Sequence, residues 1–596
     1  MMVPRLGAQP TERGCRFRLW STRARRAGVV LYDQRGRETA EHPLTPKGDG
    51  IFETELTGVQ AGVRYKFRLD DGPPLPDPYA RYLPDGVHGP AEVMSGSHNW
   101  RHTDWTGLPL ERLVIYELHI GTFTPEGTFA AARARLPYLA DLGVSAIELM
   151  PVAAFPGQRG WGYDGVAHFA PHAAYGSPDE LRELVDAAHG LGMAVLLDVV
   201  YNHWGPDGNY LSAYSPEYFT SAHKTPWGDA PNFDQAHSAY MRAYVLDNAR
   251  YWLEEFRFDG LRLDATHSIQ DDSPQHILAA LAERVEALPG GKLLIAEDER
   301  NLPRLVTDYG LDAVWADDFH HQVHVLLTRE HDGYYADYRP ELVDLAKTIH
   351  GGWLYQGEIS PHLGHPRGEP ATALGAASLV YCIQNHDQVG NRAFGERLNQ
   401  LTSLDRYRAV SALLLFLPYT PLLFMGQEWA ASTPFLYFTD HRAELGAQVT
   451  AGRRSEFGHF QAFSTPGNAE AIPDPQALAT FAASRLDWHE TGQAPYSQVF
   501  DLYRQLLALR RSDPVLSNAS RERMTVGTLA PDVLWVHRWE GTEHRLLLLN
   551  LGLERPLAEL AMPAGLSWRP LLGTTAGGQL LPMHSALLLT ATGDPA

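Results

Sequence analysis

Through the middle of the chain, short apolar runs alternate with longer amphipathic stretches, from about residue 106 to residue 515. Each run has the length of a buried strand, and the stretches between the runs carry helix-forming patterns. The eight predicted strands are 113–119, 145–149, 194–199, 260–264, 293–297, 312–316, 378–384 and 420–425. Eight strands that alternate with helices predict an α/β fold, a (β/α)8 TIM barrel whose catalytic residues stand at the carboxyl ends of its strands.

Both flanks of this region have a different pattern, in which apolar and polar residues alternate within short runs and turn residues separate the runs. The N-terminal runs are 15–20, 28–32, 51–56 and 65–69, and the C-terminal runs are 533–539 and 545–551. A β-sandwich is therefore predicted at each end. Because 596 residues exceed one ordinary hydrophobic core, we expect three domains, at 1–105, 106–515 and 516–596.

Helices between the strands can be placed from their end signals. Ser177 and Glu180 have the spacing of a capping box before a helix at 181–189. Two longer helical patterns cover 236–256 and 498–511. These three helices fit the alternation that the barrel requires.

One predicted strand carries the first chemical signal. Arg262 and Asp264 end the run at 260–264 and stand two residues apart, so on a strand both point to the same face. A guanidinium beside a carboxylate keeps that carboxylate ionised, which a carboxylate nucleophile requires. Such pairs are also often structural, so the pair alone is modest evidence.

Three other apolar runs end in polar side chains of the same kind. Asp198, Glu297 and Asp387 each follow or end a predicted barrel strand, with Asn, His and Gln residues nearby. Burial of a charged group without a partner is costly, so four such runs predict one shared polar site at the carboxyl face of the barrel. The long connections at 153–176 and 201–235 are predicted to form a cleft above this face.

In these four segments, and in this order, the chain resembles the alpha-amylase family of retaining glycoside hydrolases. The resemblance implies Asp264 as the nucleophile, Glu297 as the general acid/base and Asp387 as the aspartate that stabilises the transition state. It assigns sugar contacts to Arg262, His203 and His386, and an aromatic platform under the sugar to Tyr163. The N-terminal region is similar to the sandwich domain of branching and debranching enzymes, and we expect it to pack against the catalytic region and shape the site.

A retaining mechanism uses its two reacting carboxyl groups in different protonation states. In such enzymes these groups lie about 5–5.5 Å apart, and neighbouring strands are about 4.8 Å apart, so Asp264 and Glu297 on adjacent strands fit. Glu297 must hold a proton before the reaction. The charges of Asp264 and Asp387 are expected to raise its pKa.

No metal and no cofactor are predicted. Asp198 is expected to organise Arg262 rather than to perform chemistry. Asn202 occupies a position that binds calcium in many relatives, but it has no matching carboxylate set, so we expect an ordinary loop hydrogen bond. The segment 317–321 has a metal-like composition but no third-ligand pattern, and it is interpreted as part of the substrate subsites.

Composition narrows the class of partner. A net charge of −21 disfavours nucleic acid and anionic membranes, whereas a neutral sugar raises no electrostatic objection. The two cysteines, Cys15 and Cys382, imply neither a disulfide framework nor a metal motif. The N-terminal residues lack the apolar segment of a signal peptide, and no apolar run reaches membrane-spanning length. We therefore expect a cytoplasmic protein.

Flanking segments narrow the resemblance within the family. The segments 315–321, 384–392, 425–429 and 434–441 are similar to those of the malto-oligosyltrehalose trehalohydrolases, and Gln388 stands where branching enzymes usually carry an acidic residue. This resemblance implies hydrolysis of the α-1,4 bond beside a terminal trehalose, with malto-oligosyltrehalose and related α-glucans as substrates and a malto-oligosyltrehalose synthase as functional partner. The further substrate-contact candidates are His267, Asp298, Glu299, Asp318, His320, Gln388 and Asn391.

Two alternatives stay open at this point. One is a glycogen branching or debranching enzyme of the same family, because the shared motif residues do not separate these reactions. The other is a non-catalytic glucan-binding protein with a degenerate barrel. The intact set of Asp264, Glu297 and Asp387 argues against the second alternative.

Overall fold

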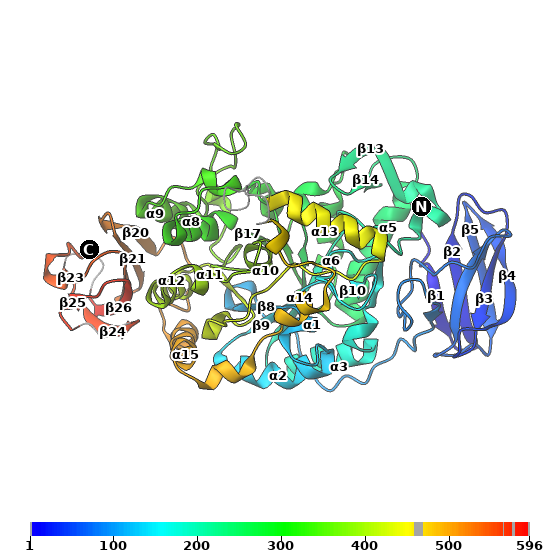
Figure 1. Cartoon of the computed structure of the whole chain (residues 1–596), viewed down its shortest axis with the longest axis horizontal. Coiled ribbons are helices and arrows are strands. Elements are labelled where there is room, and N and C mark those ends of the chain that lie inside the picture. The colour runs from blue at the N-terminus through cyan, green and yellow to red at the C-terminus, as the bar shows by residue number, and fades with distance from the viewer. Residues whose placement is uncertain (1–2, 458–468, 564, 575–577, 594–596) are drawn as a thin grey trace.

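The computed structural model describes residues 3–457, 469–563, 565–574 and 578–593. Figure 1 shows three regions in a row: a β-sheet region near the N-terminus, a central barrel with its surrounding helices, and a second sheet region near the C-terminus. The predicted TIM barrel is confirmed, because the eight central strands form a closed ring. Among the described residues, no helix combines the length and the apolar composition needed to cross a membrane.

The barrel strands neighbour each other in the order β12-β15-β16-β17-β18-β19-β8-β9, and every neighbouring pair is parallel. The strands are β8 (Ile115–Leu118), β9 (Ala146–Leu149), β12 (Ala194–Val199), β15 (Gly260–Leu263), β16 (Leu293–Ala296), β17 (Ala313–Trp315), β18 (Leu379–Tyr381) and β19 (Thr420–Phe424). All eight predicted strands are present, most of them slightly shorter than predicted. Every residue in these strands is buried, which explains why they read as continuous apolar runs.

Helices surround this ring of strands in Figure 1. They are α1 (Ile120–Phe123), α2 (Phe129–Leu142), α3 (Pro178–Gly190), α4 (Leu211–Tyr214), α5 (Ser238–Arg250), α6 (Ile277–Glu286), α7 (Arg304–Thr307), α8 (Asp317–Thr328), α9 (Leu342–Gly351), α10 (His386–Gly390), α11 (Leu398–Leu401), α12 (Leu404–Phe416), α13 (Ala443–Phe457), α14 (Leu478–Ala483) and α15 (Tyr496–Ser512). The predicted capping box of α3 is present, because Ser177 accepts from the main chain of Glu180 and Glu180 accepts in return.

The predicted helix at 236–256 is divided. Its first part is α5, and the remainder, Tyr251–Glu255, is a wider π-helical segment. Three consecutive side chains there, Tyr251, Trp252 and Leu253, are buried. The predicted helix therefore continues to residue 255, with a change from α-helical to π-helical form at Tyr251.

The N-terminal sheet has seven strands in the order β1-β2-β5-β4-β3-β6-β7. They are β1 (Gly7–Thr11), β2 (Gly14–Trp20), β3 (Ala27–Tyr32), β4 (Glu38–Gly48), β5 (Ile51–Thr57), β6 (Arg64–Leu69) and β7 (Ala91–Glu92). The sheet docks on the segment between β12 and β15: Trp20 stacks on Tyr240 with ring centroids 3.8 Å apart, and the Ser21 hydroxyl donates to the carbonyl of Tyr214 at 2.6 Å. The N-terminal region therefore packs against a segment that follows Asp198.

That segment contains the hairpin β13 (Phe219–Thr225) and β14 (Gly228–Pro231), and a second small pair, β10 (Ala153–Ala154) and β11 (Ala167–Pro171), follows β9. The C-terminal region contains a five-stranded sheet and a two-stranded sheet. Its strands are β20 (Met524–Ala530), β21 (Val533–Glu540), β22 (Glu543–Asn550), β23 (Arg555–Pro556), β24 (Arg569–Gly573), β25 (Leu580–Leu581) and β26 (Ser585–Thr592). The domain bounds at 105 and 515 stay predictions; they fall in the connections between β7 and β8 and between α15 and β20.

Candidate active site

Arg262 is the centre of the polar cluster at the carboxyl face of the barrel. It lies on β15, is fully buried, and forms ion pairs with Asp198 at 2.7 Å and with Asp264 at 2.9 Å through Nη1. Its Nη2 lies 2.9 Å from the Glu297 carboxylate. Asp198 and Arg262 are register partners on β12 and β15, and Glu297 directly follows β16, so adjacent strands bring the four groups together. The predicted contact between Asp198 and Arg262 is present.

The backbone after β15 links Asp264 to Glu297. Ala265 has a left-handed conformation, with φ of 40°, which is strained for a residue that has a Cβ atom. In this conformation its N–H donates to the Glu297 carboxylate at 2.8 Å. Asn202 donates to the Asp264 carboxylate at 2.8 Å and to its carbonyl at 2.9 Å. Asn202 thus makes a loop hydrogen bond to the Asp264 carbonyl, and it also donates to the carboxylate of this candidate nucleophile, which the sequence did not predict.

The surroundings move the pKa values of these two carboxyl groups in opposite directions. Burial raises the pKa of Asp264, but the Arg262 guanidinium and the Asn202 hydrogen bond outweigh this, and the net pKa lies below the ordinary value. Burial also raises the pKa of Glu297, and the charges of Asp264 and Asp387 raise it further, so that it lies well above the ordinary value although Arg262 opposes the shift. The surroundings thus favour the ionised form of Asp264 and the protonated form of Glu297.

Asp387 approaches the site from the first turn of α10, directly after β18 and its connection. Its side chain is 34% exposed, and its Oδ1 accepts from Asn391 at 3.1 Å and lies 3.4 Å from Nε2 of His386. The Tyr163 hydroxyl lies 2.8 Å from the same His386 nitrogen and donates to Asp198 at 2.6 Å. The Tyr163 and His386 rings stack with centroids 5.1 Å apart, so both residues lie next to the reacting carboxylates.

Sequence reasoning missed an aromatic residue at the edge of this cluster. His203 lies 3.0 Å from the Tyr163 carbonyl and stacks on Trp227, with ring centroids 4.0 Å apart and an interplanar angle of 7°. Trp227 stands between β13 and β14 and is 52% exposed. A Trp in a loop rich in Gly and Pro is a sequence signal for sugar contact. The sequence did not show, however, that Trp227 stacks on His203.

Two of the predicted substrate-contact residues, Asp298 and Asp318, have buried carboxylates. Asp298 is buried, and its oxygens accept from Thr266 at 2.8 Å and from Arg300 at 2.6 and 2.8 Å. Asp318 is fully buried and accepts from the main chain of Leu354 at 2.7 Å, among other donors. Both carboxylates are buried and accept hydrogen bonds from neighbouring loops, which they hold in place, and their contact with substrate stays a prediction.

His320 lies on α8, and its contact with substrate stays a prediction. Its side chain is buried on α8, and its Nε2 contacts Asp317 at 3.1 Å. The neighbouring His321 instead faces Gln388, with 3.3 Å between Nε2 of each side chain, and the Tyr335 hydroxyl donates to the Gln388 amide oxygen at 3.0 Å. His321 and Tyr335 therefore both contact the Gln388 side chain. The sequence did not predict either contact.

The remaining candidates differ in their exposure. Glu299 is exposed, and its carbonyl accepts from Arg367 at 3.0 Å. His267 is half-buried in the short helical turn after β15, and its Nδ1 has no hydrogen-bond partner among the described residues. The side chains of Glu299 and His267 could therefore bind a sugar without losing an internal hydrogen bond.

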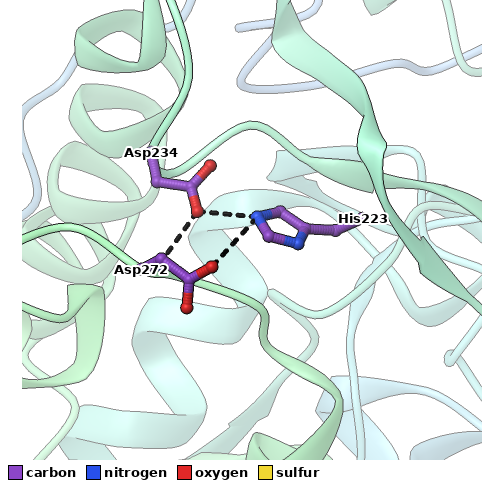
Figure 2. A group of neighbouring side chains, drawn as sticks. All are labelled: His223, Asp234 and Asp272. Carbon is purple, nitrogen blue, oxygen red and sulfur yellow. Dashed lines mark hydrogen bonds and ion pairs between the residues drawn. The ribbon is translucent and has the colours of Figure 1, made fainter.

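Among the described residues, one group of side chains has ligand atoms close enough together to hold a metal ion, and Figure 2 shows it: His223, Asp234 and Asp272. His223 lies 2.7 Å from Asp234 and 4.0 Å from Asp272. The main-chain N–H of Asp272 donates to Asp234 at 2.9 Å. These hydrogen bonds account for the grouping, and the Asp272 side chain is 87% exposed.

A closed barrel with these carboxylates at the carboxyl ends of its strands defines a glycoside hydrolase of the alpha-amylase class. The alpha amylase catalytic domain model matches residues 97–232, and the model of carbohydrate-binding module 48, the isoamylase N-terminal domain, matches residues 5–80. The chain is 53% identical to the malto-oligosyltrehalose trehalohydrolase of Deinococcus radiodurans over 96% of its own length and 93% of that protein. The chain therefore belongs to the malto-oligosyltrehalose trehalohydrolase family.

One further relative and two solved structures are also similar to the chain. The malto-oligosyltrehalose trehalohydrolase of a Rhizobium species is 42% identical over 94% of each chain. A solved structure from Salmonella typhimurium, assigned as an alpha amylase, has a TM-score of 0.90 and 39% identity and covers 99% of this chain and all of that one. A pullulanase from Bacillus acidopullulyticus shares the fold, with a TM-score of 0.74 at 17% identity, over 98% of this chain and 75% of that one.

Proposed function

We propose that the protein hydrolyses the α-1,4-glucosidic bond next to the terminal trehalose of malto-oligosyltrehalose, with retention of configuration, and releases trehalose. One observation carries the chemical part of this proposal. A single guanidinium, that of Arg262, contacts both Asp264 and Glu297, whose pKa values are shifted in opposite directions. A retaining glycosidase needs two neighbouring carboxyl groups in these two protonation states.

In this proposal Asp264 attacks the anomeric carbon while Glu297 gives its proton to the leaving oxygen. A covalent glycosyl–enzyme forms, and the trehalose leaves. Glu297, now ionised, takes a proton from water, and the water oxygen replaces Asp264 at the anomeric carbon. Asp387 stands beside this pair and can hydrogen-bond the sugar hydroxyls as the ring distorts, with His386 next to it at 3.4 Å.

The substrate part rests on the relatives, which are named malto-oligosyltrehalose trehalohydrolases at 53% and 42% identity. The side chains available on the trehalose side are His267, Glu299, Gln388 and Asn391, since Asp298, Asp318 and His320 are buried. We also propose that a malto-oligosyltrehalose synthase supplies the substrate and that both enzymes work in the cytoplasm. Conversion of maltodextrin to trehalose by a mixture of the two enzymes, but by neither alone, tests the pairing.

The deciding experiment compares the products from malto-oligosyltrehalose and from a malto-oligosaccharide of equal length. Trehalose and a shortened malto-oligosaccharide are expected from the first substrate, with much slower cleavage of the second. A 1,4-alpha-glucan branching enzyme of Corynebacterium jeikeium is 28% identical over 71% of this chain and 62% of that protein, so amylose is included as a third substrate. New α-1,6 branch points in amylose, without trehalose release, would replace the proposal with branching activity.

A further inference from the structure

Glu117, a buried glutamate next to the candidate active site, contacts one residue of that site, His386. Glu117 lies on β8 and is fully buried in the barrel interior. One of its carboxylate oxygens accepts from the main-chain N–H of His386 at 2.9 Å, and the other contacts Nδ1 of the His386 ring at 2.5 Å. Within the described part of the chain, this carboxylate accepts hydrogen bonds from His386 alone. Glu117 therefore fixes both the backbone position and the ring of that histidine.

The directions of the hydrogen bonds define the protonation of the His386 ring. An ionised carboxylate can only accept, so Nδ1 is the donor toward Glu117. On the other side, the Tyr163 hydroxyl gives its proton to Asp198 at 2.6 Å, and its oxygen is left to accept from Nε2 of His386 at 2.8 Å. A ring that donates from both nitrogens carries a positive charge.

The electrostatic surroundings agree with this geometry. Burial lowers the pKa of His386, but Asp387 and Glu117 outweigh it and raise the pKa to about 10. The titratable and charged groups that surround the ring are Glu117, His119, Glu148, Tyr163, Asp198, Arg262 and Asp387. Of these, burial lowers the pKa of His119 to about 4, which leaves that ring uncharged near neutral pH.

The neighbouring strand provides a natural contrast. Glu148 on β9 is the register partner of Glu117, and it is equally buried in the barrel. Neither of its carboxylate oxygens has a hydrogen-bond partner among the described residues. Burial and the charge of Glu117 raise the pKa of Glu148 well above the ordinary value, which favours its neutral form. Of these two adjacent glutamates at one depth, only Glu117 contacts His386.

We propose that Glu117 is a positioning residue for the hydrolysis: it holds the His386 ring as a double donor whose Nε2–H points to Tyr163 and Asp387 beside the reacting sugar. The proposal rests on the function proposed above, because His386 acts on a sugar only if that site binds one. Glu117 itself touches no substrate. Its effect on the reaction passes through the charge and the orientation of one imidazole.

The test compares Glu117→Gln with Glu148→Gln, which changes a carboxyl to an amide at the same depth. In Glu117→Gln the ring loses its negative partner, so its pKa falls and the charged form is lost as pH rises through the new value. The wild type already loses activity at alkaline pH through Glu297, so we expect kcat/KM of Glu117→Gln on malto-oligosyltrehalose to fall by a further factor of about ten per pH unit above that point, relative to the wild type. Glu148→Gln should keep the wild-type pH profile.

A second measurement separates this inference from the proposed function. NMR of protein with isotope-labelled histidine rings, with the His386 signal assigned by its loss in His386→Gln, reports the ring charge without any substrate. Between about pH 5 and 9 the signal should stay at its protonated position in the wild type and titrate in Glu117→Gln. If the wild type releases no trehalose, the proposed function is refuted. The NMR titration would still decide whether Glu117 keeps the His386 ring protonated, because it needs no substrate.

A third variant guards against a folding defect in Glu117→Gln. Glu117→Asp keeps the charge but shortens the reach, so the ring should stay protonated while kcat falls at all pH values. The inference is overturned if the His386 signal in Glu117→Gln keeps its wild-type position across the range, or if Glu148→Gln shifts it equally. It is also overturned if Glu117→Asp introduces the same alkaline loss of activity as Glu117→Gln.

Discussion

Asp264 and Asp318 both follow strands of the same barrel, both pair with an arginine, and both lie in polar clusters at its carboxyl face, yet the structure uses them differently. Asp264 contacts Arg262 and Asn202, and its side chain keeps 12% of its surface exposed. Asp318 is fully buried and faces Arg367 at 3.1 Å. It accepts hydrogen bonds from Leu354 at 2.7 Å, Tyr355 at 3.0 Å, Asn301 at 2.8 Å and Tyr338 at 2.6 Å.

The difference lies in how many lone pairs remain free. A carboxylate offers about four acceptor positions, and the donors around Asp318 fill them. Such a group holds a loop in place and has nothing left for a ligand. Asp264 keeps an open side and a charged partner, which suits a nucleophile. Of two aspartates at the same face of a barrel, the one with unfilled acceptor positions is thus the candidate for chemistry.

The largest effect is expected at Asp264, whose carboxylate keeps unfilled acceptor positions. Asp264→Asn removes the attacking charge but leaves Arg262 paired with Asp198 and Glu297. We expect kcat on malto-oligosyltrehalose to fall by more than about 10⁴-fold, with little change in the melting temperature. Steady-state kinetics and thermal unfolding measure the two quantities. Near-normal turnover would remove Asp264 from the nucleophile role.

Glu297→Gln is expected to have the next largest effect, and its size should depend on the leaving group. Without an acid, kcat on malto-oligosyltrehalose should fall about 10³-fold, whereas a glycosyl fluoride, whose leaving group needs no proton, should still form the covalent intermediate. Equal losses on both substrates would contradict the assignment of Glu297 as the acid.

The pH profile sharpens this assignment. The active form needs an ionised Asp264, whose pKa lies below the ordinary value, and a protonated Glu297, whose pKa lies well above it. Activity should thus hold between the two values, fall at acid pH as Asp264 takes up a proton, and fall at alkaline pH as Glu297 loses one. On the glycosyl fluoride, Glu297→Gln should lose the alkaline fall and keep the acid one.

At Asp318, whose acceptor positions are all filled, we expect substitution to lower the stability of the fold rather than to act on the reaction itself. Asp318→Asn turns one acceptor into a donor against the surrounding N–H and O–H groups and removes the shorter ion pair of Arg367, which then keeps the pair with Asp337 at 3.9 Å. The expected cost is about 3–5 kcal/mol in the free energy of unfolding. Asp272→Asn, at a side chain that is 87% exposed, is the matched control and should change it by less than about 0.5 kcal/mol. Denaturant unfolding measures both, and an unchanged stability in Asp318→Asn would refute the structural role.

The same contrast explains what the sequence could predict. The eight barrel strands are buried on both faces and therefore appear as continuous apolar runs, and Asp264 and Glu297 could be placed because each directly follows such a run. Asp318 also follows a strand, and nothing local distinguishes it, because its donors come from residues 301, 338, 354 and 355. Glu117 lies inside an apolar run and contacts His386, 269 positions away. Such long-range contacts leave no local pattern.

The smallest effect concerns the choice between substrates. Polar groups arranged for trehalose leave some hydrogen bonds unmade with maltose, so the wild type should cleave malto-oligosyltrehalose about a hundredfold more efficiently than a malto-oligosaccharide of equal length, or roughly 2.7 kcal/mol. Glu299→Gln and His267→Gln alter side chains that remain available to the sugar, and each should narrow this ratio by about tenfold.

His320→Gln supplies the control for this ratio, because the His320 side chain is buried and its Nε2 contacts Asp317 at 3.1 Å. A change there can lower the fraction of folded enzyme, and the efficiencies on both substrates then fall together. Competition kinetics with the two substrates in one tube measure the ratio directly and cancel differences in enzyme concentration. The prediction fails if His320→Gln narrows the ratio of the two efficiencies while Glu299→Gln and His267→Gln leave it unchanged. In that case the exposure of a side chain does not identify the groups that recognise trehalose.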